Sequence, residues 1–447
     1  MNARGIIKTA GLALLASLAL SGLVAQDREP PEPREAPEPR ETPEPREALE
    51  PRETPEPREA PEPREVHEPE VREAGEKGTE AGDTGQETGQ ETDASDIGWQ
   101  ADAIRDEGAD RDETGNPVRR GEIIAFALPA AAEQQLVASG FRVIRRTALA
   151  SLGDDVVRLA VPRGQSLPDA LRAVRAAAPA AVTDFDHYYG LGLASGSKPK
   201  RNKADSGPAE NTAALRVSIG MIDTAVTAHP ALGTAQVVSW KPGEDAHAAS
   251  QHGTAVASLM ATRGAATIYS ANIFRGPAAH PFTSVDILAE AMEWLMAQGA
   301  PVINMSIAGP PNALLEKLVA IAGSRGRMIV AAAGNSGPSA PPVYPAALPG
   351  VIAVTAVDPA LRVYRYANHG GYIAVAAQGV GVLAARAEGG YARFTGTSFA
   401  APLVSARLAR CRAEGASSIL CKGQLLKSAR DLGVTGYDDT YGHGYIE

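Results

Sequence analysis

The sequence predicts an α/β protein with a doubly wound, mostly parallel sheet, preceded by a small ferredoxin-like α+β module and a disordered Pro/Glu-rich segment. Three observations support this prediction. From Leu215 onward, continuous apolar runs alternate with helical patterns, which is typical of strands covered by helices on both faces. Residues 121–189 show a βαββαβ pattern. Residues 26–120 contain too few Ile and Val to form a core.

Composition and charge narrow the possible functions. The chain has 447 residues and a formal net charge of -10. Residues 26–120 carry 30 acidic and 13 basic side chains, so the globular remainder is mildly basic. Without a long Lys/Arg stripe, nothing points to a nucleic-acid partner. Two cysteines exclude a four-cysteine zinc or iron–sulfur site.

Residues 1–25 have the profile of a signal peptide: Arg4 and Lys8, an apolar run from Ala10 to Leu20, and small residues at Ser21 and Gly22. We therefore expect an exported protein, periplasmic or extracellular, with an uncleaved membrane anchor as the alternative. No later segment offers about 18 apolar residues in a row, so no other membrane span is expected.

Residues 26–120 are expected to be disordered. Residues 31–66 form six hexads of the type Pro-Glu-Pro-Arg-Glu-Ala, and the following stretch stays rich in Gly, Glu, Asp and Thr. Alternate prolines favour extended polyproline II. A spacer or docking tail and a tolerated low-complexity linker both fit this composition.

The module of residues 121–189 is predicted from its apolar periodicity. Its expected elements, in order, are a strand at Glu122–Leu128, a helix at Ala130–Ser139, strands at Phe141–Leu152 and Asp155–Val161, a helix at Ser166–Ala178 and a strand at Ala181–Tyr189. Residues 190–214 are rich in Gly, Ser, Lys and Asn, which predicts a flexible, protease-accessible joint.

The domain of residues 215–447 carries the α/β alternation. Its expected strands are VSIGMID, TIYSANIF, PVINMSI, MIVAAAG, GVIAVTAVD and YIAVAAQG, and its expected helices are TAVASLMA, VDILAEAMEWLMAQG, ALLEKLVAIAGSRG and TSFAAPLVSARLARC. In such a sheet, polar residues at the carboxyl ends of strands are the first candidates for a site.

Four residues at such positions provide the parts for acyl transfer. Asp223 ends a strand, His252 and Ser398 begin helices, and Asn335 ends the strand MIVAAAGN. A serine becomes nucleophilic when a neutral imidazole removes its proton and a carboxylate orients that imidazole. An amide such as Asn335 and the backbone N–H of Ser398 can stabilise the oxyanion. Singly, each residue could equally be a helix cap or a turn residue.

The motifs HGTAVA, NMSIAGP, AAAGNSGP and GTSFAAP occur together from Leu215 to Ile446, in an order that resembles the subtilisin-like serine proteases. The resemblance implies a serine endopeptidase that works through an acyl-enzyme. It implies Asp223 as the orienting carboxylate, His252 as the general acid/base, Ser398 as the nucleophile and Asn335 as the oxyanion donor. The alternative is a weak or inactive subtilisin-like scaffold protein on a proline-rich stalk.

The sequence departs from the family pattern at two places outside the pocket. Thr224 and Ala225 follow the aspartate where the family usually has a small residue and then Gly. The stretch ATRGAATIYSANIF lacks the long loop that holds calcium in many relatives. Since calcium needs six to eight oxygens, we expect no metal there and no cofactor.

The resemblance also implies a substrate groove. Its residues are Ser306, Ala308 and Gly309 on one side, with Ala333, Gly334 and Val343 on the other. Ala308 and Val343 stand where Gly is common, so the first specificity pocket is expected to be shallower. A compensating backbone shift is the alternative.

The βαββαβ module resembles the prodomain of this family, which implies an autoinhibited, self-processing zymogen. An unrelated ligand-binding domain is the alternative. The expected partners are protein or peptide substrates and the chain's own prodomain, and a monomer is expected. Cys411 and Cys421 predict a disulfide in an oxidising compartment, with free thiols as the alternative.

Overall fold

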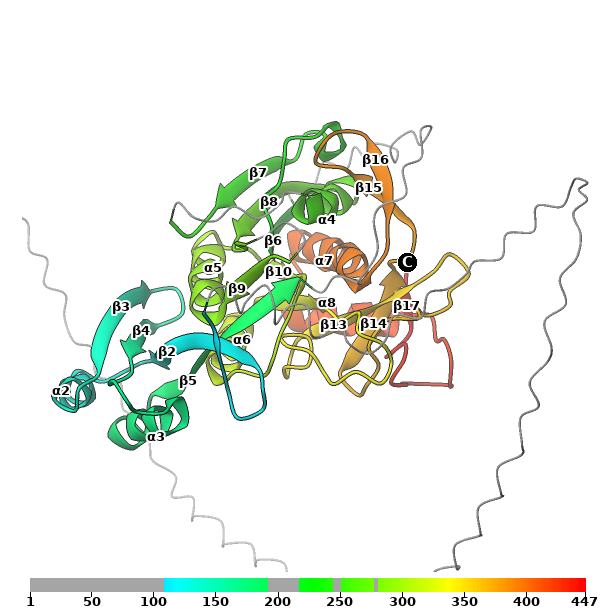
Figure 1. The fold of residues 1–447 in the computed structure, drawn as a ribbon. Helices are drawn as coiled ribbons and strands as arrows, with labels where there is room; N and C mark the ends of the chain where they lie inside the picture. Colours follow the sequence, from blue (N-terminus) through cyan, green and yellow to red (C-terminus); the bar gives the residue numbers. More distant parts are fainter. Residues whose placement is uncertain (1–107, 192–216, 244–250, 277–279) are drawn as a thin grey trace, which may run out of the picture. The chain divides into compact units, whose positions relative to one another are not determined.

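The computed structural model describes residues 108–191, 217–243, 251–276 and 280–447 (Figure 1). The expected signal peptide, the Pro-Glu-Pro-Arg-Glu repeat and residues 192–214 of the joint lie outside the described residues. We refer to residues 108–191 as the N-terminal module and to residues 217–447 as the C-terminal domain.

The N-terminal module is an antiparallel sheet with two helices. Its strands lie in the order β5-β2-β4-β3, and its core is formed by residues such as Ile123, Leu136 and Val174. This is the strand order of the predicted ferredoxin-like pattern. The elements are β1 (Asp110–Arg111), β2 (Pro117–Phe126), α2 (Ala130–Ala138), β3 (Arg142–Leu149), β4 (Asp154–Ala160), α3 (Leu167–Ala177) and β5 (Val182–Leu191).

The regular structure begins earlier and ends later than the expected module boundaries. β1 and the start of β2 fall before residue 120, where disorder was expected, so that boundary is wrong. The turn between them is held by Asp112, whose Oδ1 accepts hydrogen bonds from the backbone N–H groups of Thr114 and Asn116. An acidic composition predicts disorder but does not reveal a carboxylate that satisfies its own turn. At the other end, β5 continues to Leu191, two residues beyond the expected strand.

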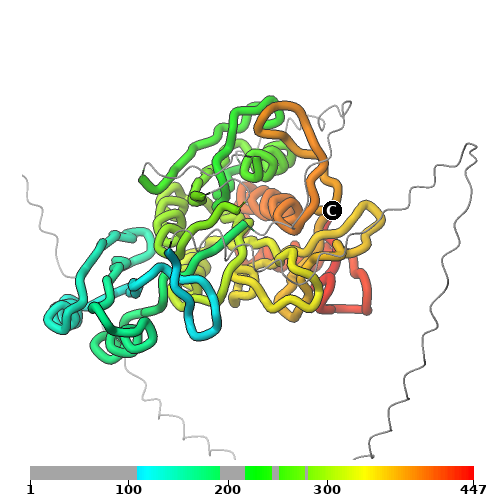
Figure 2. The backbone as a smooth tube through the Cα atoms, viewed as in Figure 1, coloured from blue at the N-terminus to red at the C-terminus, as the bar shows by residue number. Residues whose placement is uncertain are grey.

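The C-terminal domain contains an eight-stranded sheet in the order β17-β14-β13-β12-β10-β6-β8-β7, with every neighbouring pair parallel. Figure 2 traces the backbone through these strands, from green to red. The strands are β6 (Val217–Asp223), β7 (Gln236–Trp240), β8 (Ala265–Asn272), β10 (Val302–Met305), β12 (Met328–Ala332), β13 (Ile352–Val357), β14 (Ile373–Gln378) and β17 (Tyr445–Ile446).

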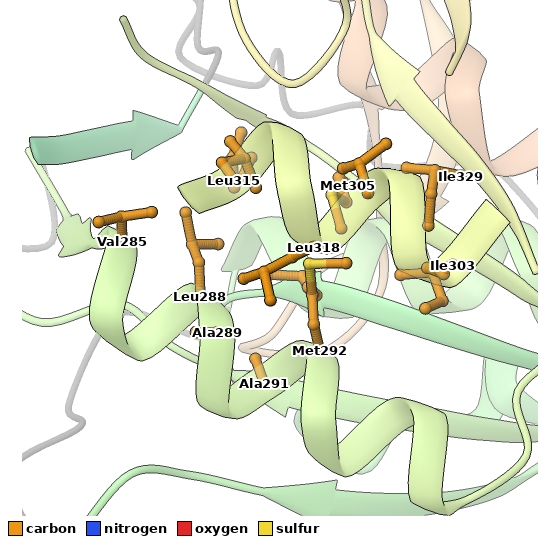
Figure 3. Packing of buried hydrophobic residues seen from close by; sticks show 14 of the residues in the cluster. Val285, Leu288, Ala289, Ala291, Met292, Ile303, Met305, Leu315, Leu318 and Ile329 are labelled. Carbon is orange, nitrogen blue, oxygen red and sulfur yellow. The ribbon is translucent and has the colours of Figure 1, made fainter. Parts of the chain in front are cut away.

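Helices cover both faces of this sheet. Those of one face are α5 (Val285–Ala297) and α6 (Ala313–Ser324), and those of the other are α4 (Gln251–Thr262) and α7 (Thr397–Ala413), followed by α8 (Ser418–Lys427). Figure 3 shows Ile303 and Met305 of β10 packed among Leu288 and Met292 of α5 and Leu318 of α6. Their neighbour Val302 belongs to the core on the opposite face. The predicted doubly wound α/β class is confirmed.

Short elements complete the described structure. β9 (Phe282–Ser284) and β11 (Ile307–Ala308) both pair with β5 of the N-terminal module. β15 (Val382–Ala385) and β16 (Tyr391–Phe394) form a separate hairpin. Within the described ranges, no helix has both the length and the apolar character needed to cross a membrane.

Candidate active site

Asp223 and His252 are in direct contact. Asp223 ends β6, the strand VSIGMID, and is fully buried. His252 is the second residue of α4, and its Nδ1 lies 2.7 Å from Oδ1 of Asp223. A neutral imidazole that donates its Nδ1–H to a carboxylate keeps a lone pair on Nε2. The pair therefore has the geometry of an oriented base.

Thr224 connects these two residues through its backbone and its side chain. Its N–H donates to Oδ1 of Asp223 at 2.7 Å, and its Oγ1 accepts the N–H of Gly253 at 2.8 Å. The residue that departs from the family pattern thus joins the aspartate turn to the helix that carries His252. The sequence identified Thr224 as a departure from the family pattern, but it did not predict the hydrogen bonds of Thr224 to Asp223 and Gly253.

Ser398 is the second residue of α7 and is buried. Within the described part of the chain, the side-chain atoms Ser398 Oγ, His252 Nε2 and Asp223 Oδ2 have no hydrogen-bond partner. The ring of Phe399, next to the serine, lies 5.2 Å from the imidazole ring of His252, centroid to centroid. The serine hydroxyl and the second imidazole nitrogen are thus both without a hydrogen-bond partner among the described residues, and the ring contact brings the first turn of α7 to the histidine.

Asn335 follows β12 and is held by Thr397. Its Oδ1 accepts the backbone N–H of Thr397 at 2.9 Å and the Thr397 hydroxyl at 3.1 Å. These two donors fix which end of the amide is oxygen, so the NH₂ group points away from Thr397. Gly334 has φ 111°, and a Cβ there would lie 2.7 Å from the Asn368 side chain, so the turn requires glycine. Thr397 lies in the quoted GTSFAAP motif but was not predicted as a site residue.

The two predicted sides of the groove meet at one backbone pairing. Gly309 and Tyr344 exchange two hydrogen bonds of 3.1 and 3.0 Å, which brings the segment Ser306–Gly309 beside Val343. Ser306 is fully buried, whereas Ala308 and Val343 are partly buried. On the other predicted side, the carbonyl of Ala333 accepts a hydrogen bond from the hydroxyl of Tyr372 at 2.8 Å.

β5 of the N-terminal module lies along one predicted side of the groove, β11, and its other edge pairs with β9, which was not predicted as a side of the groove. Leu191 pairs with Ile307 and Gly190 with Ala308 on one side, and Tyr189 pairs with Thr283 on the other, all antiparallel. The Tyr189 ring is buried against Gly309, where an added Cβ would collide with it, and its hydroxyl donates to the carbonyl of Pro310 at 2.9 Å. Burial raises the pKa of this phenol well above its usual value.

A buried ion cluster joins the module to the start of α5. Arg119 lies 2.7 Å from Asp186 and 3.3 Å from Asp286, and it also donates to Ser284 Oγ at 2.7 Å. Arg158 lies 3.1 Å from the other oxygen of Asp286. Burial, together with the nearby Asp286, raises the pKa of Asp186 to about 7.

The connection from α4 to β8 is two residues long, Arg263 and Gly264. In the described part of the chain, no group of three His, Cys, Asp or Glu side chains is placed to hold a metal ion. The expectation that calcium is absent remains a prediction. Cys411 and Cys421 form the predicted disulfide, with an S–S distance of 2.06 Å, and it ties the end of α7 to α8.

Comparison with known proteins shows which sequences resemble this chain. A profile of the subtilase family matches residues 215–444, just over half of the chain. Subtilisin BL of Lederbergia lenta is 31% identical over 244 residues, which cover 52% of this chain and 88% of the relative. Subtilisin DY of Bacillus licheniformis is 31% identical over 262 residues, which cover 55% of this chain and 93% of the relative.

Among solved structures, the chain resembles fervidolysin from Fervidobacterium pennivorans, described as a keratinolytic enzyme related to subtilisin. The TM-score is 0.61 at 21% sequence identity, over 74% of this chain. The chain spans 60% of the fervidolysin chain. At this identity the likeness supports the fold alone.

Proposed function

The chain belongs to the subtilase family and is a serine endopeptidase, and from this premise we propose that Asp223, His252 and Ser398 form its catalytic triad. We further propose that the protein is made as an exported, autoinhibited zymogen that processes itself. In this proposal residues 121–189, with the additional residues from 108, form the prodomain, and residues 215–447 form the peptidase domain.

The observation that carries the triad is the 2.7 Å contact between Asp223 and His252. Among the described residues, the proposed proton donor, Ser398 Oγ, and the proposed acceptor, His252 Nε2, have no hydrogen-bond partner. In the proposed mechanism, Ser398 Oγ attacks the substrate carbonyl while His252 Nε2 takes the hydroxyl proton. Asp223 stabilises the imidazolium that results. His252 then gives this proton to the leaving amine, and water hydrolyses the acyl-enzyme by the same route in reverse.

The oxyanion of the tetrahedral intermediate needs donors that are in place before the reaction. We assign this role to the Asn335 amide and to the backbone N–H of Ser398 in the first turn of α7. The Thr397 contacts to Asn335 Oδ1 support the assignment because they orient the amide, with its oxygen toward Thr397 and its NH₂ group on the opposite side. The positive end of the α7 dipole adds to the stabilisation.

The zymogen proposal is supported by β5. An extended segment that adds a strand between β9 and β11 binds as a peptide substrate would, by main-chain hydrogen bonds plus side-chain anchors. Tyr189 is such an anchor because it is buried against Gly309. The bond to be cut during processing then lies beyond Leu191, in the joint that ends at residue 214.

The proposed prodomain also supplies hydrogen-bond acceptors to the first turns of α5 and α6, the two helices on one face of the peptidase sheet. Asp184 accepts the N–H of Ala313 at the start of α6, at 2.7 Å, and Asp186 accepts the N–H of Asp286 at the start of α5, at 3.2 Å. First-turn N–H groups have no partner within their own helix. These contacts support a role in folding, since a sheet built from distant segments forms slowly without a template.

Export is proposed from residues 1–25, and the periplasm or the extracellular space is the proposed destination. The disulfide between Cys411 and Cys421 agrees with an oxidising compartment. The substrates are proteins or peptides, and we propose that the enzyme acts as a monomer.

A fluorophosphonate that reacts only with an activated serine tests the triad. We expect labelling of the processed wild-type enzyme and of Ser258→Ala, a buried helix serine whose hydroxyl bonds to Ala255 and Ala385. We expect none in Ser398→Ala. If the folded, processed wild-type enzyme is not labelled, the inactive scaffold becomes the better interpretation.

A further inference from the structure

The nucleophile's helix contains a proline four residues after the nucleophile. Pro402 lies inside α7 and has no N–H, so the carbonyl of Ser398 cannot receive the usual helix hydrogen bond from the residue four positions later. Both residues are buried. A buried carbonyl without a donor is costly, so a group from elsewhere should supply one.

Ser306 supplies this donor. Its Oγ lies 3.5 Å from the carbonyl oxygen of Ser398, which is longer than the usual O–H···O distance of about 2.5–3.0 Å and makes this a weak hydrogen bond. Ser306 lies between β10 and β11, directly before β11, the strand with which a substrate is proposed to pair. A long bond of this kind depends on where the hydroxyl proton points, and this direction is set by the neighbours of Ser306.

Asn304 and Ser405 set that direction. Asn304 donates its Nδ2–H to Ser306 Oγ at 3.1 Å, so the Ser306 proton must point elsewhere, toward Ser398. The Asn304 amide is itself oriented because Ser405 donates its hydroxyl to Oδ1 at 3.0 Å. All three side chains are completely buried. The bonds run from α7 to β10, on to Ser306, and back to the first turn of α7.

We propose that Asn304 and Ser405 are positioning residues for the nucleophile. They act through Ser306, whose hydroxyl replaces the helix hydrogen bond that Pro402 cannot donate. This contact fixes the position of the turn that carries Ser398 relative to β11. This inference rests on the proposed role of Ser398. A network that only stabilised the core would lower the thermal midpoint on mutation but leave the turnover of the folded enzyme unchanged.

Two substitutions test the network in the processed enzyme, with active sites titrated by fluorophosphonate. Ser405→Ala removes the donor that orients Asn304. We expect kcat and the labelling rate to fall about tenfold, since small displacements of a catalytic group are costly, with KM within about twofold. Ser405→Thr keeps the hydroxyl and should restore kcat. Ser258→Ala is the matched control and should keep the wild-type kcat.

Asn304→Asp gives a signature that a structural role would not produce. A protonated Asp can donate to Ser306 as Asn does, but an ionised Asp can only accept, which would turn the Ser306 proton away from Ser398. We expect the kcat of Asn304→Asp, relative to wild type, to fall as pH rises. If Asn304→Asp does not fold, the Ser405 pair decides alone.

Wild-type kcat in folded Ser405→Ala, or a change confined to KM, would overturn the positioning role while leaving the triad intact. If Ser398→Ala itself retained activity, the proposed triad would fail instead, so the two failures are distinguishable.

Discussion

His252 has one nitrogen bound to Asp223 and one unused, which commits it to a single protonation state for catalysis. Only the neutral ring can take the serine proton. The contact with Asp223 stabilises the imidazolium after transfer but does not replace the lone pair on Nε2 that must receive the proton.

We therefore expect kcat/KM to rise with pH and then to level off, because a general base must be unprotonated to accept the serine proton. The profile should be measured with a neutral peptide substrate, so that substrate ionisation does not contribute. A profile that does not rise with pH would contradict general-base catalysis by His252.

Asn335 gives a second prediction at this scale. Asn335→Ala removes a donor to the oxyanion, which exists only in the transition state, so kcat should fall with little change in KM. The size we expect, about 10²–10³, is the known effect of removing the corresponding donor in subtilisin, carried over to this chain. Thr397→Val should act in the same direction but more weakly, because the backbone N–H still orients the amide. A rise in KM of this size with an unchanged kcat would reject the oxyanion assignment.

At the scale of elements, the Asp186 carboxylate accepts a hydrogen bond from the first turn of α5, and its surroundings raise its pKa. Burial and Asp286 raise the pKa of Asp186 to about 7, well above the ordinary aspartate value of about 4. The same surroundings lower the pKa of Asp286, through Arg119 and Arg158 against the effect of burial. A raised carboxylate pKa means that the folded chain takes up a proton at Asp186.

The stability gained from this proton is fully present below about pH 4 and is lost as pH rises through about 7. In the inactive Ser398→Ala background, Asp186→Asn mimics the protonated side chain and should remove this dependence. We expect the thermal midpoint of the parent, relative to Asp186→Asn, to decline between pH 4 and pH 7. Asp286 contributes in the opposite direction only at lower pH. A constant difference across this range would refute the raised pKa.

The groove formed by β11 and the segment around Val343 permits a prediction about specificity. If the methyl groups of Ala308 and Val343 narrow the pocket, peptides with small or medium apolar residues before the scissile bond should be cut faster than those with Phe or Tyr. A methylene is worth about 1–3 kcal/mol in such a pocket, so the preference should be graded. Val343→Gly should shift the profile toward aromatic residues. A wild-type preference for Phe or Tyr would show that Val343 is wrongly assigned to the pocket.

The sequence could predict elements whose signal is local, but not those that depend on distant partners. The run VSIGMID and the helix after GTSFAAP are apolar or periodic over their own length, and both were predicted. β9 and β11 are two or three residues long and exist as strands only because β5 lies between them. The residues of the proposed triad could be singled out because each lies in a contiguous motif, whereas the contact between Asn304 and Ser405 joins residues 101 positions apart.

At the scale of the whole chain, the proposed prodomain and the peptidase domain are joined through β5, which pairs with β9 and β11. In the proposed zymogen, the covalent link beyond Leu191 keeps β5 close to β9 and β11, so that β5 pairs with them again after each dissociation. In this proposal, cutting the joint removes the covalent link, and release of the prodomain then opens the cleft between β9 and β11 to other peptides.

Ser398→Ala should therefore yield a folded, full-length chain that is never cut in the joint, because the same nucleophile cuts both the joint and foreign substrates. The measurement is a purified refolding reaction followed by mass spectrometry and N-terminal sequencing. The wild type should yield a new N-terminus between residues 192 and 215, and the Ser258→Ala control should do the same. Adding a trace of mature wild-type enzyme separates cleavage within one chain from cleavage between chains. If each molecule cuts only its own joint, the Ser398→Ala precursor stays intact with the added enzyme, whereas cleavage between chains would cut it between residues 192 and 215. If purified Ser398→Ala were cut without added enzyme, self-processing by Ser398 would be wrong.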